Sequence, residues 1–202
     1  MSPSGDVKVL ALFDFDETLT MRDTLPAFLA FLQPAPGFYF KAIQALPAIL
    51  RWKLGFSTNQ KAKEALMGAF MKGKTLVELE EKGRQFAKEV MPRFWRKEAV
   101  DKLKWHLAAG HEVWVVSASC ETWVVPAMSI FPEVRVIGSQ LAVCQGLVSG
   151  LLEGKNCHGP EKVKRIHEAI AVSSYTTIYA YGDSQGDHEM LALADQAFYR
   201  RF

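Results

Sequence analysis

The sequence has few cysteines, and their arrangement forms no framework. Its 202 residues include only Cys120, Cys144 and Cys157, with no Cys-x-x-Cys pair among them. An odd and scattered set of this kind excludes a disulfide scaffold and a cysteine-based structural zinc site. It favours a reducing compartment, and we expect the protein to be cytoplasmic.

The sequence also lacks a signal peptide and an uninterrupted apolar run. Residues 1–6 are polar, without the basic-then-apolar order of a signal peptide. A membrane span needs about 20 mostly apolar residues, and the most hydrophobic stretch, residues 37–55, is broken by Lys, Gln, Pro and Arg. We predict a buried helix there, with Phe38, Tyr39 and Trp52 in the core. Membrane contact through an interfacial helix is open to this stretch but is not expected.

No charge of one sign dominates the chain, whose net charge is +2. Residues 21–95 nevertheless hold 12 Lys/Arg and 6 Asp/Glu, while the rest of the chain is mildly acidic. Such a basic segment would attract an anionic substrate, although an unevenly charged solvated surface explains it equally well. We expect no nucleic-acid partner.

What the sequence does contain is an alternation of strand and helix patterns. Apolar runs typical of buried strands lie at residues 7–13, 111–116, 134–137, 177–181 and 197–199, and residues 140–152 read as a hairpin around Gln145-Gly146. Residues 21–95 show helical patterns only. We predict an α/β fold, a doubly wound parallel sheet with an all-α cap inserted after the first strand. The core would comprise residues 1–20 and 96–202, and the cap residues 21–95.

Acidic side chains follow two of the predicted strands. Asp14 and Asp16 come directly after the first strand, and alternate side chains of an extended backbone share one face. Asp183 and Asp187 follow the strand at residues 177–181. Because ligands bind at the carboxyl ends of the strands in open α/β sheets, these groups can converge there. Carboxylate oxygens suit Mg²⁺, which the sequence therefore predicts as a cofactor.

Two further positions supply groups that bind phosphate. Ser117 follows the strand at residues 111–116, and Lys162 lies near the start of a helix opened by Pro160. Hydroxyl groups, helix-start N–H groups and an ammonium are common phosphate ligands. The combined set predicts a phosphoryl group beside Mg²⁺.

Taken together, these motifs resemble those of the haloacid dehalogenase superfamily. In chain order they are Asp14-Phe15-Asp16-Glu17-Thr18, Ser117-Ala118-Ser119, Lys162 and Gly182-Asp183-Ser184-x-x-Asp187. The helical insertion and the pattern Asn156-Cys157-x-Gly159-x-x-Lys162 resemble its subfamily IB, which is similar to phosphoserine phosphatase.

The resemblance implies a Mg²⁺-dependent phosphatase that hydrolyses a small phosphomonoester through an aspartyl phosphate. Asp14 would be the nucleophile and Asp16 the general acid and base, with Lys162 as a third catalytic residue. The implied phosphate-binding residues are Thr18, Ser117, Ala118 and Lys162. The implied metal ligands are Asp14, Asp16 through its carbonyl, and Asp183, with Asp187 and Ser184 supporting them.

Several alternatives remain open at this point. The apolar, basic residues 37–55 suggest a lipid phosphatase of the phosphatidylglycerophosphate type. A phosphotransferase and a non-catalytic phosphate-binding protein of the same fold are the others. A cap that recognises an amino acid would use an Arg and a Glu, for which Arg22, Arg51 and Glu64 are the candidates. The sequence gives no oligomeric state.

Overall fold

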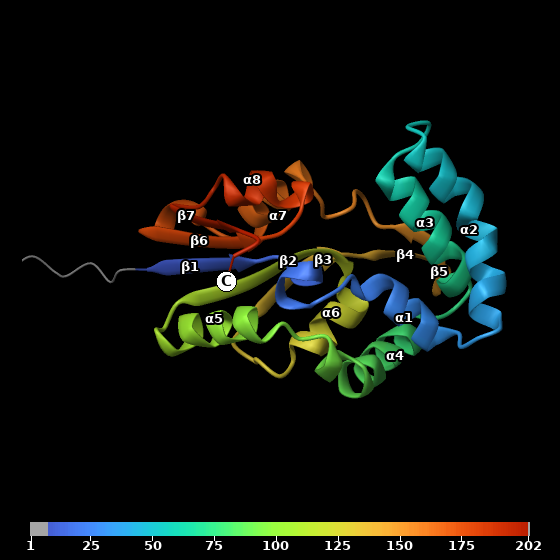
Figure 1. Ribbon diagram of the computed structural model, residues 1–202, viewed down its shortest axis with the longest axis horizontal. Helices are drawn as coiled ribbons and strands as arrows, with labels where there is room; N and C mark the ends of the chain where they lie inside the picture. The colour runs from blue at the N-terminus through green and yellow to red at the C-terminus, as the bar shows by residue number, and fades with distance from the viewer. Residues whose placement is uncertain (1–7, 202) are drawn as a thin grey trace, which may run out of the picture.

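A five-stranded parallel sheet forms the centre of the computed structural model, which describes residues 8–201 (Figure 1). The polar residues 1–6 therefore lie outside the described part. The strand order is β3-β2-β1-β6-β7. The strands are β1 (Val9–Phe13), β2 (Glu112–Cys120), β3 (Arg135–Ser139), β6 (Thr177–Gly182) and β7 (Gln196–Tyr199). The predicted doubly wound parallel sheet is confirmed.

Helices cover both faces of this sheet (Figure 1). Helices α7 (Pro160–Ala169) and α8 (His188–Leu191) lie on one face, joined to β6 by the short turns η3 (Val172–Ser174) and η4 (Gln185–Asp187). Helices α5 (Lys97–Ala108) and α6 (Glu121–Met128) lie on the other face. The strand order reverses beside β1, which pairs with β2 on one side and β6 on the other. A ligand site is expected at the carboxyl end of such a switch point.

The chain between β1 and α5 is helical, as the sequence predicts. It comprises the turn η1 (Phe15–Leu19), helices α1 (Thr24–Leu32), α2 (Gly37–Lys53), α3 (Asn59–Met71) and α4 (Leu76–Glu89), and the short helix η2 (Met91–Arg93). Thr58 and Thr75 cap α3 and α4 through their side-chain oxygens. The sequence pattern and the caps thus agree on where these two helices begin.

The predicted hairpin is confirmed as β4 (Leu141–Cys144) and β5 (Leu147–Leu152). Gln145 and Gly146 at its turn have φ of 51° and 79°, as a two-residue hairpin loop of this twist requires. The hairpin packs against α3 through β5.

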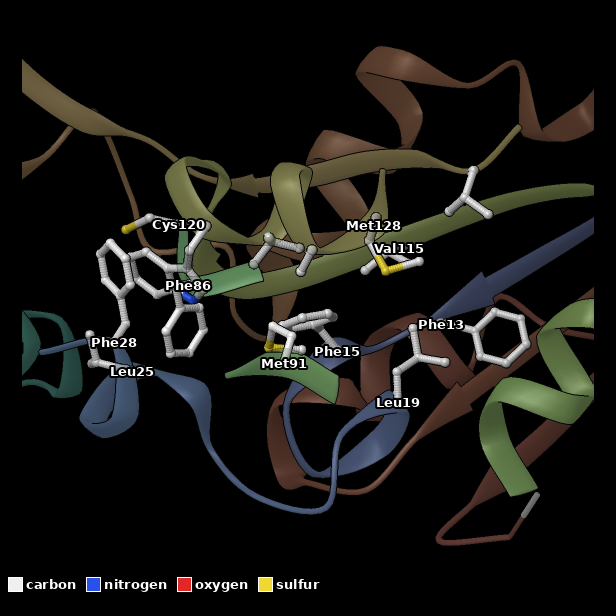
Figure 2. Close-up of a cluster of buried hydrophobic side chains, with 14 of the residues drawn as sticks. Phe13, Phe15, Leu19, Leu25, Phe28, Phe86, Met91, Val115, Cys120 and Met128 are labelled. Carbon is white, nitrogen blue, oxygen red and sulfur yellow. The ribbon is translucent and has the colours of Figure 1, made fainter. Parts of the chain in front are cut away.

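One apolar core joins the sheet to the helical insertion (Figure 2). It runs from Phe13 on β1 through Phe15 to Phe28 on α1 and Phe86 on α4. The Phe28 ring stacks on Trp123 of α6 at 4.7 Å and meets the edge of Phe86 at 5.3 Å. The insertion is therefore anchored through α1 and α4 to the face of the sheet that α6 covers.

Helix α2 is an exception, because its predicted burial is wrong. Only Ala45 on this helix is buried, while Tyr39 is 64% exposed and Trp52 38% exposed. Phe38 alone of the three predicted core aromatics packs against the core. The physical reason is that α2 packs on one side, against α3.

Between residues 8 and 201, no helix combines the length and apolar character needed to cross a membrane.

A histidine is buried against the sheet on the α5 side. His106 is fully buried, with Nε2 3.0 Å from the Tyr181 hydroxyl and Nδ1 2.7 Å from Nδ1 of His111. Burial, followed by the charges of His111 and Lys102, lowers the pKa of His106 to about 4. The imidazole is therefore neutral in the folded protein at neutral pH.

Helices α4 and α6 approach so closely that Gly83→Ala should destabilise the protein. A Cβ at Gly83 would lie 2.0 Å from the carbonyl oxygen of Thr122, so one helix must move. We expect a loss of about 1–3 kcal/mol in the free energy of unfolding, measured by urea denaturation. Gly68→Ala on α3 is the control, since its Cβ meets only ordinary contacts from 3.8 Å. That change should be neutral or stabilising, and equal losses for both variants would contradict the close approach.

Acid should destabilise the protein through His106. The unfolded chain binds a proton near the ordinary histidine pKa of about 6.5, whereas folded His106 does so only at about 4. The unfolded state therefore binds a proton at a higher pH than the folded state does. As a result, the free energy of unfolding falls by about 2 kcal/mol as pH drops between these two values. His106→Gln removes this titration, so its unfolding free energy should fall less over the same interval. Parallel pH profiles for the two proteins would refute this expectation.

Candidate active site

Asp14 lies at the carboxyl end of β1, where the strand order reverses. Its N–H donates to the carbonyl of Tyr181 on β6 at 2.9 Å, which extends the strand pairing by one residue. The chain then turns sharply through η1, with Glu17 at φ 59°. Only 6% of Asp14 is exposed. The backbone thus fixes this carboxylate at the switch point of the sheet.

The ammonium of Lys162 is the central group of the site. It donates to Asp14 Oδ1 at 2.6 Å, to the Val116 carbonyl at 2.7 Å and to Asp187 Oδ1 at 2.7 Å. The side chain is fully buried. Since an ammonium has three hydrogens, all of them are directed at protein oxygens. Lys162 therefore joins Asp14 after β1 and Val116 within β2 to the loop after β6.

The loop after β6 orients its two acidic residues in different ways. Asp187 Oδ2 accepts the N–H groups of Asp183 (3.2 Å) and Ser184 (2.9 Å) and the Ser184 hydroxyl (2.8 Å). Asp183 Oδ1 accepts the hydroxyl of Thr18 at 3.3 Å. A Cβ at Gly182 would lie 2.6 Å from Cβ of Asp187, so a glycine is needed for the loop to close.

Three carboxylates of this site could hold a metal ion. Asp14, Asp183 and Asp187 each offer an oxygen within 4.8 Å of the others. Hard oxygen donors of this kind fit Mg²⁺, and the ionised forms of three carboxyl groups outnumber the one ammonium, which leaves negative charge for a divalent cation to offset. The Asp16 side chain is not part of this group. The third carboxylate of the group is that of Asp187, which the sequence analysis predicts to support the metal ligands.

Burial sets the protonation of these carboxyl groups. It raises the pKa of Asp14 to about 8, against the opposing charge of Lys162. Burial, together with the charge of Asp187, also raises the pKa of Asp183. The pKa of Asp187 lies below its usual range, because Lys162 and the N–H donors outweigh its burial. A cation bound between these groups would stabilise the ionised form of Asp14 at neutral pH.

The carboxylate of Asp16 is held by two residues that the sequence analysis did not select. Thr24 donates both its N–H (2.7 Å) and its hydroxyl (2.6 Å) to Oδ1, and the Ser119 hydroxyl donates to Oδ2 at 2.5 Å. Trp123 Nε1 in turn donates to the Thr24 hydroxyl oxygen at 3.0 Å. Ser119 belongs to the motif Ser117-Ala118-Ser119, so the sequence offers a signal for it. Thr24 belongs to no motif, so only the structure identifies it as a partner of Asp16.

Arg96 is a second residue that the sequence did not indicate. Its guanidinium donates to the carbonyls of Glu17 (2.9 Å) and Thr18 (3.1 Å), in the turn that follows Asp14. Arg96 precedes α5 and belongs to no motif, so only the tertiary structure identifies it. It stabilises the turn that carries Asp14 and Asp16.

A small cavity of about 130 Å³ opens onto these groups. It is lined by Asp14, Asp16, Glu17, Asp23, Ala118, His158, Lys162, Asp183, Ser184 and Asp187. Thr18 and Ser117, predicted to bind phosphate, are fully buried and are not among the residues that line it. The Ser117 hydroxyl oxygen accepts the N–H of Ser119 at 2.9 Å. It therefore shapes the carboxyl-terminal part of β2, which carries Ala118 and continues past the predicted end at residue 116 to Cys120.

A larger cavity of about 310 Å³ shares Asp16, Asp23, Ala118 and His158 with the small one. It extends to the helical insertion, where its walls include Leu25, Ile49, Trp52 and Leu66. The walls that the insertion contributes are therefore mainly apolar.

Lys63 of α3 is the basic side chain that lines the larger cavity. It donates to the Ala118 carbonyl at 2.5 Å and to Asn156 Oδ1 at 3.0 Å, so it connects the insertion to the carboxyl-terminal part of β2 and to the segment after β5. Arg22, Arg51 and Glu64, the three candidates from the sequence, do not line this cavity. Glu64 instead accepts the N–H of Leu152 at 3.2 Å. Nothing in the sequence distinguished Lys63 from its neighbour Lys61.

Known proteins are similar to this chain in sequence and in fold. The protein CicA of Caulobacter vibrioides is 36% identical over 206 residues, which cover 98% of this chain and 88% of CicA. A crystal structure of a protein of unknown function from Bordetella pertussis superimposes with a TM-score of 0.80 at 26% identity, over 93% of this chain and 87% of the other. A phospho-aspartyl intermediate analogue of phosphoserine phosphatase superimposes with a TM-score of 0.65 at 18% identity, over 94% and 84%.

The sequence model of one family covers nearly all of the chain. Residues 11–192 match the haloacid dehalogenase-like hydrolases, a range that runs from β1 to the end of α8. This range includes Asp14, Lys162 and the loop after β6. The chain therefore belongs to the haloacid dehalogenase-like hydrolase family.

Proposed function

We propose that the protein is a Mg²⁺-dependent phosphatase that hydrolyses a phosphomonoester through an aspartyl phosphate on Asp14. The observation that carries this proposal is the buried pair of Asp14 and Lys162, with Asp183 and Asp187 beside it, at the edge of a small cavity. Membership of a hydrolase family supports it. The similarity in fold to a phospho-aspartyl form of phosphoserine phosphatase is consistent with it.

Asp14 would attack the phosphorus atom with the carboxylate oxygen that Lys162 does not hold. Lys162 bonds Oδ1 and therefore leaves Oδ2 for the attack. Its positive charge lies close enough to stabilise the ionised nucleophile and to offset charge that develops on the phosphoryl oxygens. Because its hydrogens already point at protein oxygens, its contribution rests on charge and on the placement of Asp14.

Asp16 would protonate the leaving oxygen and later take a proton from the attacking water. Its carboxylate lies where the two cavities meet, since it lines both. Thr24 and Ser119 hold it there through both oxygens. The phosphoryl group would occupy the small cavity beside Ala118 and Lys162, and the leaving group the larger one.

Asp14, Asp183 and Asp187 are the side chains that would hold Mg²⁺, and the Asp16 carbonyl remains a proposed ligand. Bound there, the ion supplies positive charge to the phosphoryl oxygens and to the nucleophile. The hydroxyl of Thr18 and the N–H groups of the loop after β6 would keep the acidic side chains oriented.

The helical insertion would select the substrate as a cap. In this proposal residues 21–95 form the cap, and residues 1–20 and 96–202 form the core. The walls of the larger cavity favour a leaving group with an apolar portion beside Leu25, Ile49 and Trp52. Lys63 at its inner end would favour a further anionic or hydrogen-bonding group on the substrate. The three free cysteines are consistent with the cytoplasm, which we retain as the expected location.

Replacing the nucleophile should abolish hydrolysis without unfolding the protein. We expect Asp14→Asn to lower the kcat for p-nitrophenyl phosphate with Mg²⁺ by at least about a thousandfold. Asp101→Asn is the control, because Asp101 lies on the surface of α5 and pairs with Lys97. A beryllofluoride adduct on the wild-type protein, absent from Asp14→Asn, would identify the modified side chain by mass spectrometry. Substantial hydrolysis by folded Asp14→Asn would refute the assignment.

Metal binding can be tested apart from catalysis. We expect calorimetric titration with Mg²⁺ to give weaker binding for Asp183→Asn than for the wild type, by about tenfold or more. The same loss is expected for Asp187→Asn if its carboxylate is a ligand. Glu189→Gln, at an exposed position of α8, is the matched control. Unchanged Mg²⁺ affinity in both aspartate variants would argue against this metal site.

A further inference from the structure

The outer side of α2 and the turn after it form an exposed apolar surface. Its members are Tyr39, Phe40, Ile43, Leu46, Leu50, Leu54 and Phe56. Three of them, Phe40, Ile43 and Phe56, are 71%, 66% and 74% exposed. Large side chains scattered singly over a surface need no explanation, but a contiguous group of this size marks an interaction site.

The spacing of these residues places them on one side of the helix. Positions 39, 43, 46 and 50 recur at intervals of three and four, which aligns them along the axis. The opposite side of α2 is also apolar, where Ala45 is buried and Phe38 packs against Phe70 of α3 at 5.4 Å. A helix that is apolar on both sides is adapted to an apolar environment on both. Among the described residues, apolar contacts cover only the side of α2 that faces α3.

The charges around this surface have one sign. Residues 24–63, which include all of α2, contain no Asp or Glu, so every charged side chain of this helix is a cation. Arg51 and Lys53, near the end of α2, are both exposed. On a helical projection they fall on opposite flanks of the apolar side. The surface thus combines apolar area with flanking cations that can reach away from it.

We propose that the outer side of α2 docks onto an anionic phospholipid bilayer, with the helix axis in the plane of the membrane. Apolar side chains would enter the boundary of headgroups and acyl chains, and the flanking cations would contact phosphates. A helix of this length presents about 25 Å of continuous apolar side to the bilayer. The proposal concerns binding and does not depend on the proposed hydrolysis.

The charges favour a bilayer over a second copy of this chain. A twofold dimer through this surface would pack together two copies of a helix whose charged side chains are all cations. Residues 24–63 have no acidic side chain to pair with them, and like charges at an interface oppose association. An anionic lipid surface supplies the charge that the protein lacks.

The test is flotation of the full chain with vesicles of phosphatidylcholine, alone or mixed equally with phosphatidylglycerol. The wild type should bind the mixed vesicles and lose affinity in high salt. Ile43→Glu/Leu50→Glu should weaken binding by about tenfold or more, through lost apolar contact and added negative charge. Val77→Glu/Ile130→Glu is the matched control, because those side chains are 70% and 59% exposed on other elements. Circular dichroism would confirm that both variants are folded.

The outcomes separate the possible occupants of the surface. Selective loss of vesicle binding in the α2 variant, with retention in the control, supports the proposal. Failure of the wild type to float with mixed vesicles would overturn it. So would a dimer in light scattering that the α2 variant dissociates, because the occupant would then be a second copy. Hydrolysis of p-nitrophenyl phosphate, measured on the same samples, reports separately on the proposed chemistry.

Discussion

The buried ammonium of Lys162 is the interaction on which the site depends. Removing such a charge from water costs several kcal/mol, which nearby opposite charges offset only if the geometry is good. Here two carboxylates and a carbonyl surround it at 2.6–2.7 Å. They come from the end of β1, from Val116 within β2 and from the loop after β6, so these segments must meet in one register. Within residues 8–201, no buried side-chain nitrogen or oxygen lacks a hydrogen-bond partner. The same contacts that balance the charge also bring Asp14, Asp187 and Lys162 together.

Much of this arrangement could be predicted because its signals are local. A run of apolar residues that ends in Asp14 and Asp16 indicates both a buried strand and its polar end. Gln145-Gly146 indicates a hairpin since its backbone angles suit few other residue pairs. Parallel strands share one carboxyl edge, and this rule brings Asp14, Lys162 and Asp183 together without any knowledge of contacts.

The rest could not be predicted because it depends on contacts between distant segments. Thr24 binds Asp16 and Arg96 binds the turn after Asp14, yet neither belongs to a local pattern. Lys63 lines a cavity only because of the direction from which α3 approaches β2. The burial of α2 was predicted wrongly for a different reason. A helix that is apolar on every side gives no periodicity to show which side faces the protein.

The close contact between α4 and α6 has a mechanical consequence. With no room for a methyl group at Gly83, neither helix can shift toward the other. Helix α1 is equally constrained, because Thr24 at its start bonds to Asp16. Helix α3 is tied to the carboxyl-terminal part of β2 through Lys63 and packs against β5. Helix α2, which packs on one side, is therefore the compliant wall of the larger cavity. Under the proposed function, α2 would therefore be the part of the cavity wall that can yield to a substrate while the other helices of the insertion stay in place.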